Sequence, residues 1–255
     1  MEEEITVDVV YTIWLRHIKR YIRSRSRIVG SLGMPLFFLL VLGFGLNSVV
    51  NLPGMGQDYM GFLIPGIISM SVLFTSVFSG IQIIWDKQFG FLKETLVAPV
   101  SRMEIMLGQT LGGATTSLIQ GLIILVFSLF LGLSISNLYG FFVACAFMVL
   151  IGLSFTAFGI AIASRMEDMH GFQLIMNFVI FPLFGLSGAL FPLNSLPSWI
   201  KPLTLMDPLA YGVEGIRYGL LGTSQINPYF CWIVLAGFTI FMMTFGSYLF
   251  RKIQI

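Results

Sequence analysis

The sequence has little charge. Of its 255 residues, 10% are Asp, Glu, Lys or Arg, whereas 56% are hydrophobic. A typical soluble domain carries roughly 25% charged residues, so the composition excludes an ordinary soluble protein. Several long apolar stretches contain no Asp, Glu, Lys, Arg or His at all. Because proton-coupled carriers place a titratable group at membrane depth, this absence argues against a proton relay or a charged ion site there.

Signals for metal, nucleotide and covalent chemistry are also missing. The only cysteines, Cys145 and Cys231, lie in apolar runs without ligand spacing, so neither a metal site nor a disulfide framework is expected. No Gly-Lys dipeptide is present, which excludes a P-loop. The N-terminus opens with three glutamates and has no basic leader, so we expect insertion through the first span and no cleaved signal peptide.

The long apolar stretches predict an all-α membrane protein. A spanning helix needs about 20 mostly apolar residues. Six stretches meet this length, and they predict a transmembrane domain over residues 29–253. The predicted spans cover residues 29–50, 60–84, 106–133, 138–163, 172–192 and 228–249.

The basic residues predict the orientation of these spans. If the six spans alternate in direction, 12 of the 14 Lys and Arg residues fall on one side, and only Lys201 and Arg217 fall on the other. Short loops rich in Lys and Arg stay in the cytoplasm. We therefore expect a multi-pass protein of the cell membrane (plasma or inner) with both termini in the cytoplasm.

The first 28 residues predict an amphipathic helix at the membrane surface. Val7, Tyr11, Trp14, Ile18 and Ile22 recur at helical spacing and form one apolar stripe. Cations project from the opposite side, namely Arg16, Lys19, Arg20 and Arg23. Such a helix lies in the headgroup plane with its cations toward water or anionic lipid. It either anchors the first span alone or also contacts a cytoplasmic partner.

The segment from Gly185 to Arg217 is too apolar for a solvated loop and too interrupted for one helix. Four prolines break it, at positions 192, 197, 202 and 208. Trp199 and Tyr211 favour a membrane–water boundary. Broken backbone beside a bilayer is tolerated only where protein or a water-filled cavity covers it, which favours a gate over a linker. Lys201 and Arg217 face Asp207 and Glu214 in this segment, and local pairing is expected.

The connection from Trp85 to Gly113 predicts a structured element on the cytoplasmic side. Gly90 interrupts it, and Pro99 precedes Ser101 and Glu104, whose spacing is that of a capping box at a helix start. A short helix with apolar residues ahead of Pro99 suits docking onto another protein. The alternative is a plain turn at the membrane surface.

Small and polar residues within the spans predict contacts between helices. The pairs are Ser76/Gly80, Gly108/Gly112 and Gly159/Ala163, each four residues apart. The amides Gln82, Gln109, Gln120 and Asn177 are expected to form hydrogen bonds between helices, in preference to binding a substrate.

Two motifs make the chain similar to the permeases of type-2 ABC exporters. The first is Asp-Lys-x-x-Gly, followed by Glu-Thr-Leu-x-x-Ala-Pro-Val-Ser-Arg and Leu-Gly-x-x-Leu-Gly, after the second span. The second is Leu-Ser-Gly-Ala-Leu-Phe-Pro, followed by Leu-Pro-x-Trp and Asp-Pro-Leu-Ala-Tyr-Gly-Val-Glu-Gly-Ile-Arg, before the last span. The resemblance covers essentially the whole chain. It is greatest for the compact subgroup that includes daunorubicin-resistance-type drug exporters and nodulation-factor exporters. One departure is Gln109, where many relatives carry Lys, so a contact with phosphate or an acidic group is not expected there.

The resemblance implies a division of labour between subunits. Two six-span permeases, identical or different, pair in the membrane and dock on two cytoplasmic ABC ATPases. ATP and Mg would bind to the ATPases, so no cofactor and no catalytic residue is expected in this chain, and its other partners are membrane lipids, not nucleic acid. The residues implied in coupling to the ATPase are Asp86, Phe89, Gly90, Lys93, Glu94, Pro99, Arg102, Glu104, Glu167 and Asp168.

On the outer side, the resemblance implies two short re-entrant helices that cap the pathway. The residues expected at this outer gate are Phe191, Pro192, Pro197, Trp199, Asp207, Pro208, Tyr211, Glu214 and Arg217. The implied function is ATP-driven export of an amphipathic drug-like or lipid-like substrate. Export of a lipid-linked polysaccharide by a permease of the same class is an alternative. An ATP-independent carrier or channel, and a scaffold that transports nothing, are alternatives of other classes.

Overall fold

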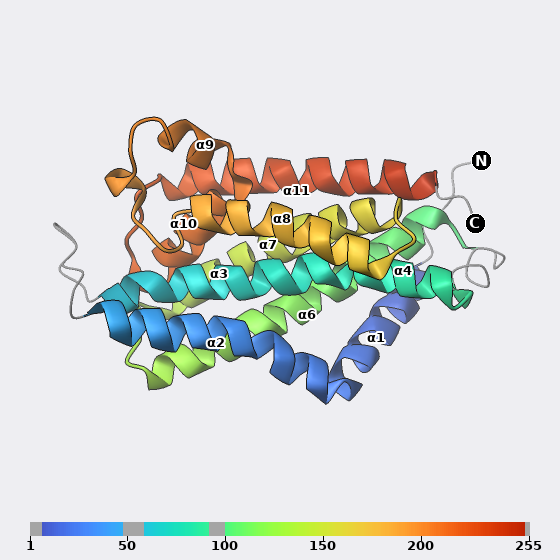
Figure 1. Cartoon of the computed structure of the whole chain (residues 1–255), viewed down its shortest axis with the longest axis horizontal. Coiled ribbons are helices and arrows are strands. Elements are labelled where there is room, and N and C mark those ends of the chain that lie inside the picture. Colours follow the sequence, from blue (N-terminus) through green and yellow to red (C-terminus); the bar gives the residue numbers. More distant parts are fainter. Residues whose placement is uncertain (1–6, 48–58, 92–99, 253–255) are drawn as a thin grey trace.

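The computed structural model describes residues 7–47, 59–91 and 100–252, and the regular elements in these ranges are all helices. The α-helices and one short 3-10 helix, η1, form a bundle whose long axis is horizontal in Figure 1. They are α1 (Val7–Arg23), α2 (Arg25–Asn47), α3 (Tyr59–Ser79), α4 (Ile81–Gln88), α6 (Arg102–Phe130), α7 (Leu138–Ala163), α8 (Met169–Leu186), η1 (Leu193–Ser195), α9 (Lys201–Met206), α10 (Pro208–Leu221) and α11 (Pro228–Arg251).

The prediction of six spans is confirmed. The helical segments long and apolar enough to cross a membrane are Ile28–Gly45, Tyr59–Gln88, Arg102–Phe130, Leu138–Ala163, Met169–Leu186 and Pro228–Arg251. The second of these combines α3 and α4. The fifth ends earlier than the predicted residue 192, because Gly188 adopts a left-handed φ of 74° and turns the chain.

The bundle has a buried centre and a lipid-accessible periphery. In the apolar window of the span formed by α3 and α4, 78% of the residues are buried. The corresponding shares for the spans of α2, α8 and α11 are 17%, 22% and 22%. Helix α7 packs against α3, α6, α10 and α11. In Figure 1, α4 lies at the end of the bundle near both termini, and α9 and α10 lie at the opposite end. We call these the termini end and the α9 end.

Glycine allows the central helices to approach backbone to backbone. A Cβ added at Gly80 would lie 2.5 Å from the carbonyl carbon of Gly159, and one added at Gly159 would collide with the Val77 carbonyl. Gly80 and Gly159, one member of each of the predicted pairs Ser76/Gly80 and Gly159/Ala163, therefore meet where α3 and α4 contact α7. With no hydrophobic force between helices in lipid, such close packing is a main source of their association.

We predict that Gly159→Leu destabilises the bundle by about 1–3 kcal/mol, because backbone opposite the new side chain cannot move aside as a flexible side chain could. The matched control is Gly237→Leu on α11, where an added Cβ meets no atom within 4 Å. Thermal unfolding of the purified protein in detergent should show a lower Tm for Gly159→Leu only. Equal midpoints for the two variants would contradict the packing argument.

Candidate functional site

At the termini end, the buried carboxylate of Asp86 fastens α1 to α4. Arg16 Nη2 donates to Asp86 Oδ2 at 2.6 Å, and Arg20 Nη1 lies 3.5 Å from Oδ1. Gln82, one turn earlier on α4, donates its amide to Oδ1 at 2.8 Å. Asp86 is 3% exposed. Asp86, which the resemblance implies in ATPase contact, therefore lies within the chain's own packing.

A second face of α1 packs against α6. Trp14 Nε1 donates to Thr115 Oγ1 at 3.0 Å, and Tyr21 Oη donates to Gln120 Oε1 at 2.6 Å. His17 Nδ1 lies 3.1 Å from Gln109 Oε1. Of the four amides predicted to bond between helices, two do so here, Gln109 and Gln120; Gln82 bonds within α4, and Asn177 is half-buried on α8.

Glycines on α6 make this contact possible. A Cβ at Gly108 would lie 2.7 Å from Ile13 Cβ, and one at Gly112 would lie 2.6 Å from His17 Cβ. The apolar stripe predicted on α1 divides in consequence. Trp14 and Ile18 are half-buried, while Val7, Tyr11 and Ile22 stay exposed. The exposed part is the surface that α1 can offer to lipid.

Helix α4 is also tied to the connection between α7 and α8. Lys87 Nζ donates to the carbonyls of Ser164 at 2.6 Å and Met166 at 3.3 Å. Gln88 Nε2 donates to the carbonyl of Glu167 at 2.8 Å. The two connections that the resemblance assigns to ATPase contact are therefore joined through backbone carbonyls.

The Asp168 side chain caps α8. Its carboxylate accepts from Gly171 N at 2.7 Å and His170 N at 3.1 Å. The hydrogen bond from Gly171, followed by that from His170, lowers the pKa of Asp168. The side chains of Glu167 and Asp168 are both exposed. Asp168 therefore holds the start of α8 and stays accessible at the surface.

Exposed aromatic residues follow α4. Phe89 is 60% exposed and stacks on Trp85 with ring centroids 5.3 Å apart, and Phe91 is also exposed. Gly90 between them has a left-handed φ of 77°. We call Trp85, Phe89 and Phe91 the aromatic element. The predicted coupling residues Lys93, Glu94 and Pro99 lie outside the described residues.

The predicted capping box at the start of α6 is confirmed. Ser101 Oγ accepts from Glu104 N at 3.2 Å, and Glu104 Oε2 accepts from Ser101 N at 2.7 Å. The Arg102 guanidinium donates to the carbonyl of Arg251 at the end of α11. The residues predicted for coupling here thus order the junction between α6 and α11.

At the α9 end, the proline-rich segment folds into short elements. After the turn at Gly188 come η1, α9 and α10, and α10 ends at Gly222, which has a φ of 74°. Tyr211 is buried and donates its hydroxyl to the carbonyl of Leu205 at 2.7 Å. Phe191 and Trp199, which are predicted gate residues, are exposed. Pro192 and Pro197, also predicted gate residues, lie outside the helices, and Pro208 is the first residue of α10.

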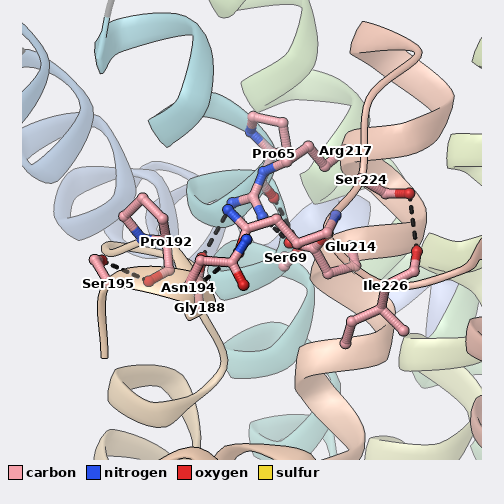
Figure 2. Close-up of polar contacts among 11 residues, drawn as sticks. Pro65, Ser69, Gly188, Pro192, Asn194, Ser195, Glu214, Arg217, Ser224 and Ile226 are labelled. Carbon is pink, nitrogen blue, oxygen red and sulfur yellow. Dashed lines mark hydrogen bonds and ion pairs between the residues drawn. The ribbon is translucent and has the colours of Figure 1, made fainter. Parts of the chain in front are cut away.

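The centre of this end is a fully buried ion pair. The side chains of Glu214 and Arg217 are 0% and 2% exposed, and Arg217 Nη1 donates to Glu214 Oε1. Arg217 Nη2 donates to the carbonyl of Gly188 at 3.0 Å, and its guanidinium carbon lies 4.0 Å from the ring centroid of Phe62. The backbone N–H of Gln225 donates to Glu214 Oε2. Figure 2 shows Arg217 reaching from α10 toward the Gly188 turn.

This ion pair joins separate parts of the chain: α10, α3, the turn after α8, and the connection before α11. Gln225 adds a further link by accepting from Asn194 N at 3.1 Å. The predicted pairing of Arg217 with Glu214 is confirmed. The structure shows no ion pair between Lys201 and Asp207, since Lys201 is exposed and Asp207 accepts from Leu209 N at 2.8 Å. That part of the pairing prediction is wrong, because Asp207 serves as the N-cap of α10.

The comparison with known proteins agrees with this architecture. The sequence model of the family described as "ABC-2 type transporter" matches residues 8–221. This chain belongs to the ABC-2 transporter family. It is similar to the inner membrane transport permease YadH of Escherichia coli (strain K12), with 26% identity over 84% of each chain. It is also similar to nodulation protein J of Rhizobium meliloti (strain 1021), with 29% identity over 84% of this chain and 82% of the relative.

The chain is therefore the permease subunit of an ABC-2 transporter, a membrane component without a catalytic domain. Three contacts of this permease were missed from the sequence: Phe62 beneath Arg217, Gly188 as its acceptor, and the packing of α1 on α6. The pair Gly108/Gly112 was the available signal for the last of these. No local pattern marks Phe62 as the partner of a cation about 150 positions away.

We predict that Glu214→Gln strongly destabilises the permease. Removing one partner of a buried pair leaves an uncompensated charge, which typically costs about 3–5 kcal/mol. The double variant Glu214→Gln/Arg217→Met should recover much of the loss, because neither charge remains. Tm and the yield of monodisperse protein report both effects, with Lys201→Gln as the exposed-charge control. A Glu214→Gln variant with the wild-type Tm would show that the pair contributes nothing to stability.

Asp207 makes the α9 end sensitive to pH. Burial raises the pKa of Asp207 to about 7, although the hydrogen bond from Leu209 N lowers it. In the unfolded chain the ordinary value is 3.8. Between pH 4 and 7, Asp207 is therefore protonated in the folded state and ionised in the unfolded state. The free energy of unfolding falls as the pH rises through this window, and this contribution is constant above pH 7.

Asp207→Asn should remove this dependence. Asn caps a helix about as well as Asp but carries no charge. We predict similar Tm values for the variant and the wild type near pH 4, and a higher Tm for the variant at pH 8. Thermal unfolding in detergent across this range tests the prediction. Parallel pH profiles for the two proteins would count against a buried titrating carboxylate.

Proposed function

We propose that this permease is the membrane half of an ATP-driven exporter. A separate ABC ATPase, which binds ATP and Mg, docks at the termini end, and substrate moves outward between this protomer and a second one, identical or different. The observation that carries the proposal is the exposed aromatic element at the end of the most buried span. Contiguous exposed aromatic side chains beside a polar surface are typical of a protein interface.

The contacts around α4 supply a route for coupling. Helix α4 extends the span of α3 and holds α1 through Asp86 and the α7–α8 connection through Lys87. A force applied at Phe89 therefore reaches α3 along its axis, α1 through the Arg16 ion pair, and α8 through its N-terminal connection. This is the set of helices that closure of an ATPase dimer would have to move.

The orientation follows from the charges. Both termini, α1 and the aromatic element belong to the end that gathers most of the basic residues, which supports a cytoplasmic location for the termini end. The α9 end then faces outward, remote from the ATPase. Its proposed role is exit gating, with η1, α9 and α10 as the re-entrant cap and the Glu214–Arg217 pair as its attachment to α3.

For the substrate class, we propose an amphipathic drug-like or lipid-like molecule. A lipid-linked polysaccharide is the second candidate. An ATP-independent carrier or channel is disfavoured, because the predicted spans contain no titratable residue to read an ion gradient.

The test of this function is co-purification of the full-length permease with the ABC ATPase encoded beside its gene. The complex should hydrolyse ATP faster when a transported amphiphile is added. In reconstituted vesicles, accumulation of that amphiphile should require ATP. Failure to bind any such ATPase, or transport by the permease alone, would overturn the proposal.

Coupling should depend on the backbone at Gly90. Gly90→Pro cannot keep a φ of 77°, since proline fixes φ near −65°, and the aromatic element would be redirected. We predict that insertion and ATPase activity persist while transport per ATP falls at least tenfold, which corresponds to about 1.4 kcal/mol. Gly132→Pro is the matched control, because Gly132 has a φ of 97° in the connection after α6. Loss of coupling in both variants would show that the effect is not specific to the element.

A further inference from the structure

The N-terminal helix meets the first span at a sharp elbow. Ser24 separates α1 from α2, and its N–H donates to the carbonyl of Tyr21 at 3.1 Å while its own carbonyl accepts from Ile28 N at 3.2 Å. From this point α2 runs along α3, and α1 crosses toward α4 and α6, so that the two helices form a V in Figure 1. We call Ser24 and the adjoining turns of α1 and α2 the elbow.

One side of the elbow is a strongly basic groove. A cavity of about 1030 Å³ is lined by the cations of α1 and the first residue of α2, and by a single carboxylate. These residues are Arg16, Lys19, Arg20, Arg23, Arg25 and Asp86. The carboxylate is already shared by Arg16 and Arg20, whose side chains are still 46% and 45% exposed. The groove therefore has an excess of positive charge with accessible donors.

A second cavity lies on the membrane side of the same elbow. Its volume is about 340 Å³, within the roughly 300–1,000 Å³ of ligand pockets, and its walls come from α1, α2, α3 and α6. The apolar walls are Met34, Pro35, Met70, Phe74 and Phe78. Because three of these helices are spans, this pocket lies at membrane depth.

Four of the five hydroxyl groups that line this second cavity, all but that of Thr75, donate within the protein. Ser31 donates to the carbonyl of Ile28 at 3.0 Å, Ser79 to Ser76 at 2.6 Å, and Thr116 to Gly113 at 2.9 Å. With these donors used on the backbone, the pocket presents an apolar surface. An apolar chain, not a polar solute, fits it.

The two cavities are adjacent along α1. Arg16 and Arg20 line the basic groove, while the next residues along the chain, His17 and Tyr21, line the apolar pocket. The same short stretch of helix therefore turns cations to one cavity and ring side chains to the other. A molecule that fills both must carry an anionic group and an apolar chain.

We propose that the elbow binds an anionic phospholipid, with its phosphate in the basic groove and one acyl chain in the apolar pocket. Arg and Lys donors match phosphate oxygens, and basic residues next to a span attract anionic headgroups. An acidic protein surface would satisfy the cations but would leave the apolar pocket empty. The exposed Tyr11, Ile22 and Val29 on the same two helices require apolar surroundings, which a lipid supplies. The site is independent of export, since it needs only insertion in the membrane.

The test uses the delipidated full-length permease in detergent, without ATPase. Dioleoylphosphatidylglycerol and dioleoylphosphatidylcholine, which share their acyl chains, are titrated separately, and lipid adducts are counted by native mass spectrometry. We expect phosphatidylglycerol to bind about tenfold more tightly at low ionic strength. Inorganic phosphate is the third arm and should not displace phosphatidylglycerol at equal concentration. Displacement by inorganic phosphate would show an anion site without a lipid component and would overturn the proposal.

Variants separate the two halves of the site. Lys19→Gln/Arg23→Gln/Arg25→Gln should abolish the preference for phosphatidylglycerol while leaving the Asp86 contacts of Arg16 and Arg20 in place. Lys201→Gln, at the α9 end, is its charge control. Gly30→Leu should fill the apolar pocket and weaken both lipids, because Gly30 lines it and an added Cβ there meets no atom within 4 Å.

The matched control for the pocket is Gly33→Leu on the same helix, where an added Cβ is equally free. Gly33 is not among the pocket's lining residues. The Gly33→Leu variant should bind both lipids as the wild type does. The Tm of each variant shows whether that variant is folded. Equal binding of the two lipids by the wild type, or unchanged binding by Gly30→Leu, would overturn the proposal.

Discussion

No bulk water reaches the depth of the spans, so each polar group there must find its partner within the protein. Many hydroxyl groups in the spans follow this constraint, whereas Ser71 Oγ and Thr156 Oγ1 are buried without a hydrogen-bond partner. Inside α3, the Ser69 hydroxyl donates to the carbonyl of Pro65 at 2.8 Å. On α6, the hydroxyl groups of Thr110 and Ser128 donate to the carbonyls of Met106 and Ile124, four residues earlier. Hydroxyl groups in the spans therefore serve mainly the backbone of their own helix. Helix association uses close packing at glycine and, between α1 and α6, the hydrogen bonds of Gln109 and Gln120.

Among the described residues, the buried carboxylates Asp86, Glu104, Asp207 and Glu214 lie near the two ends, and Asp86 and Glu214 each join several elements. Asp86 is buried, but the two arginines that hold α1 to it are half-exposed, so their charges stay in contact with solvent when these contacts rearrange. Glu214 and Arg217 are enclosed, and separating them would leave charges without water, so this contact is rigid. The proposed coupling end is thus adjustable, whereas the proposed gate end moves as a unit.

Local sequence patterns predicted what depends on local physics. The spans followed from the length of apolar runs, the start of α6 from Ser101 and Glu104, and the Glu214–Arg217 pair from the acids and cations that share the outer segment. What failed depends on distant residues. The depth of that pair is decided by Phe62 and Gly188, and the packed face of α1 by the glycines of α6. A periodicity of apolar residues shows that a helix has one apolar face, but it cannot reveal a second face that packs through ring nitrogens and amides.

The span of α3 and α4 connects the two ends mechanically. Phe62, near the start of α3, lies beneath Arg217, and Asp86, near the end of α4, binds the arginines of α1. Between them the backbone is held against α7 at Val77 and Gly80, so this span cannot slide independently of α7. In the proposed coupling mechanism, a displacement at the aromatic element would tilt the span about its contact with Gly159, and the far end would move Phe62 against the enclosed guanidinium. The proposed gate would then open without a break in the Glu214–Arg217 pair.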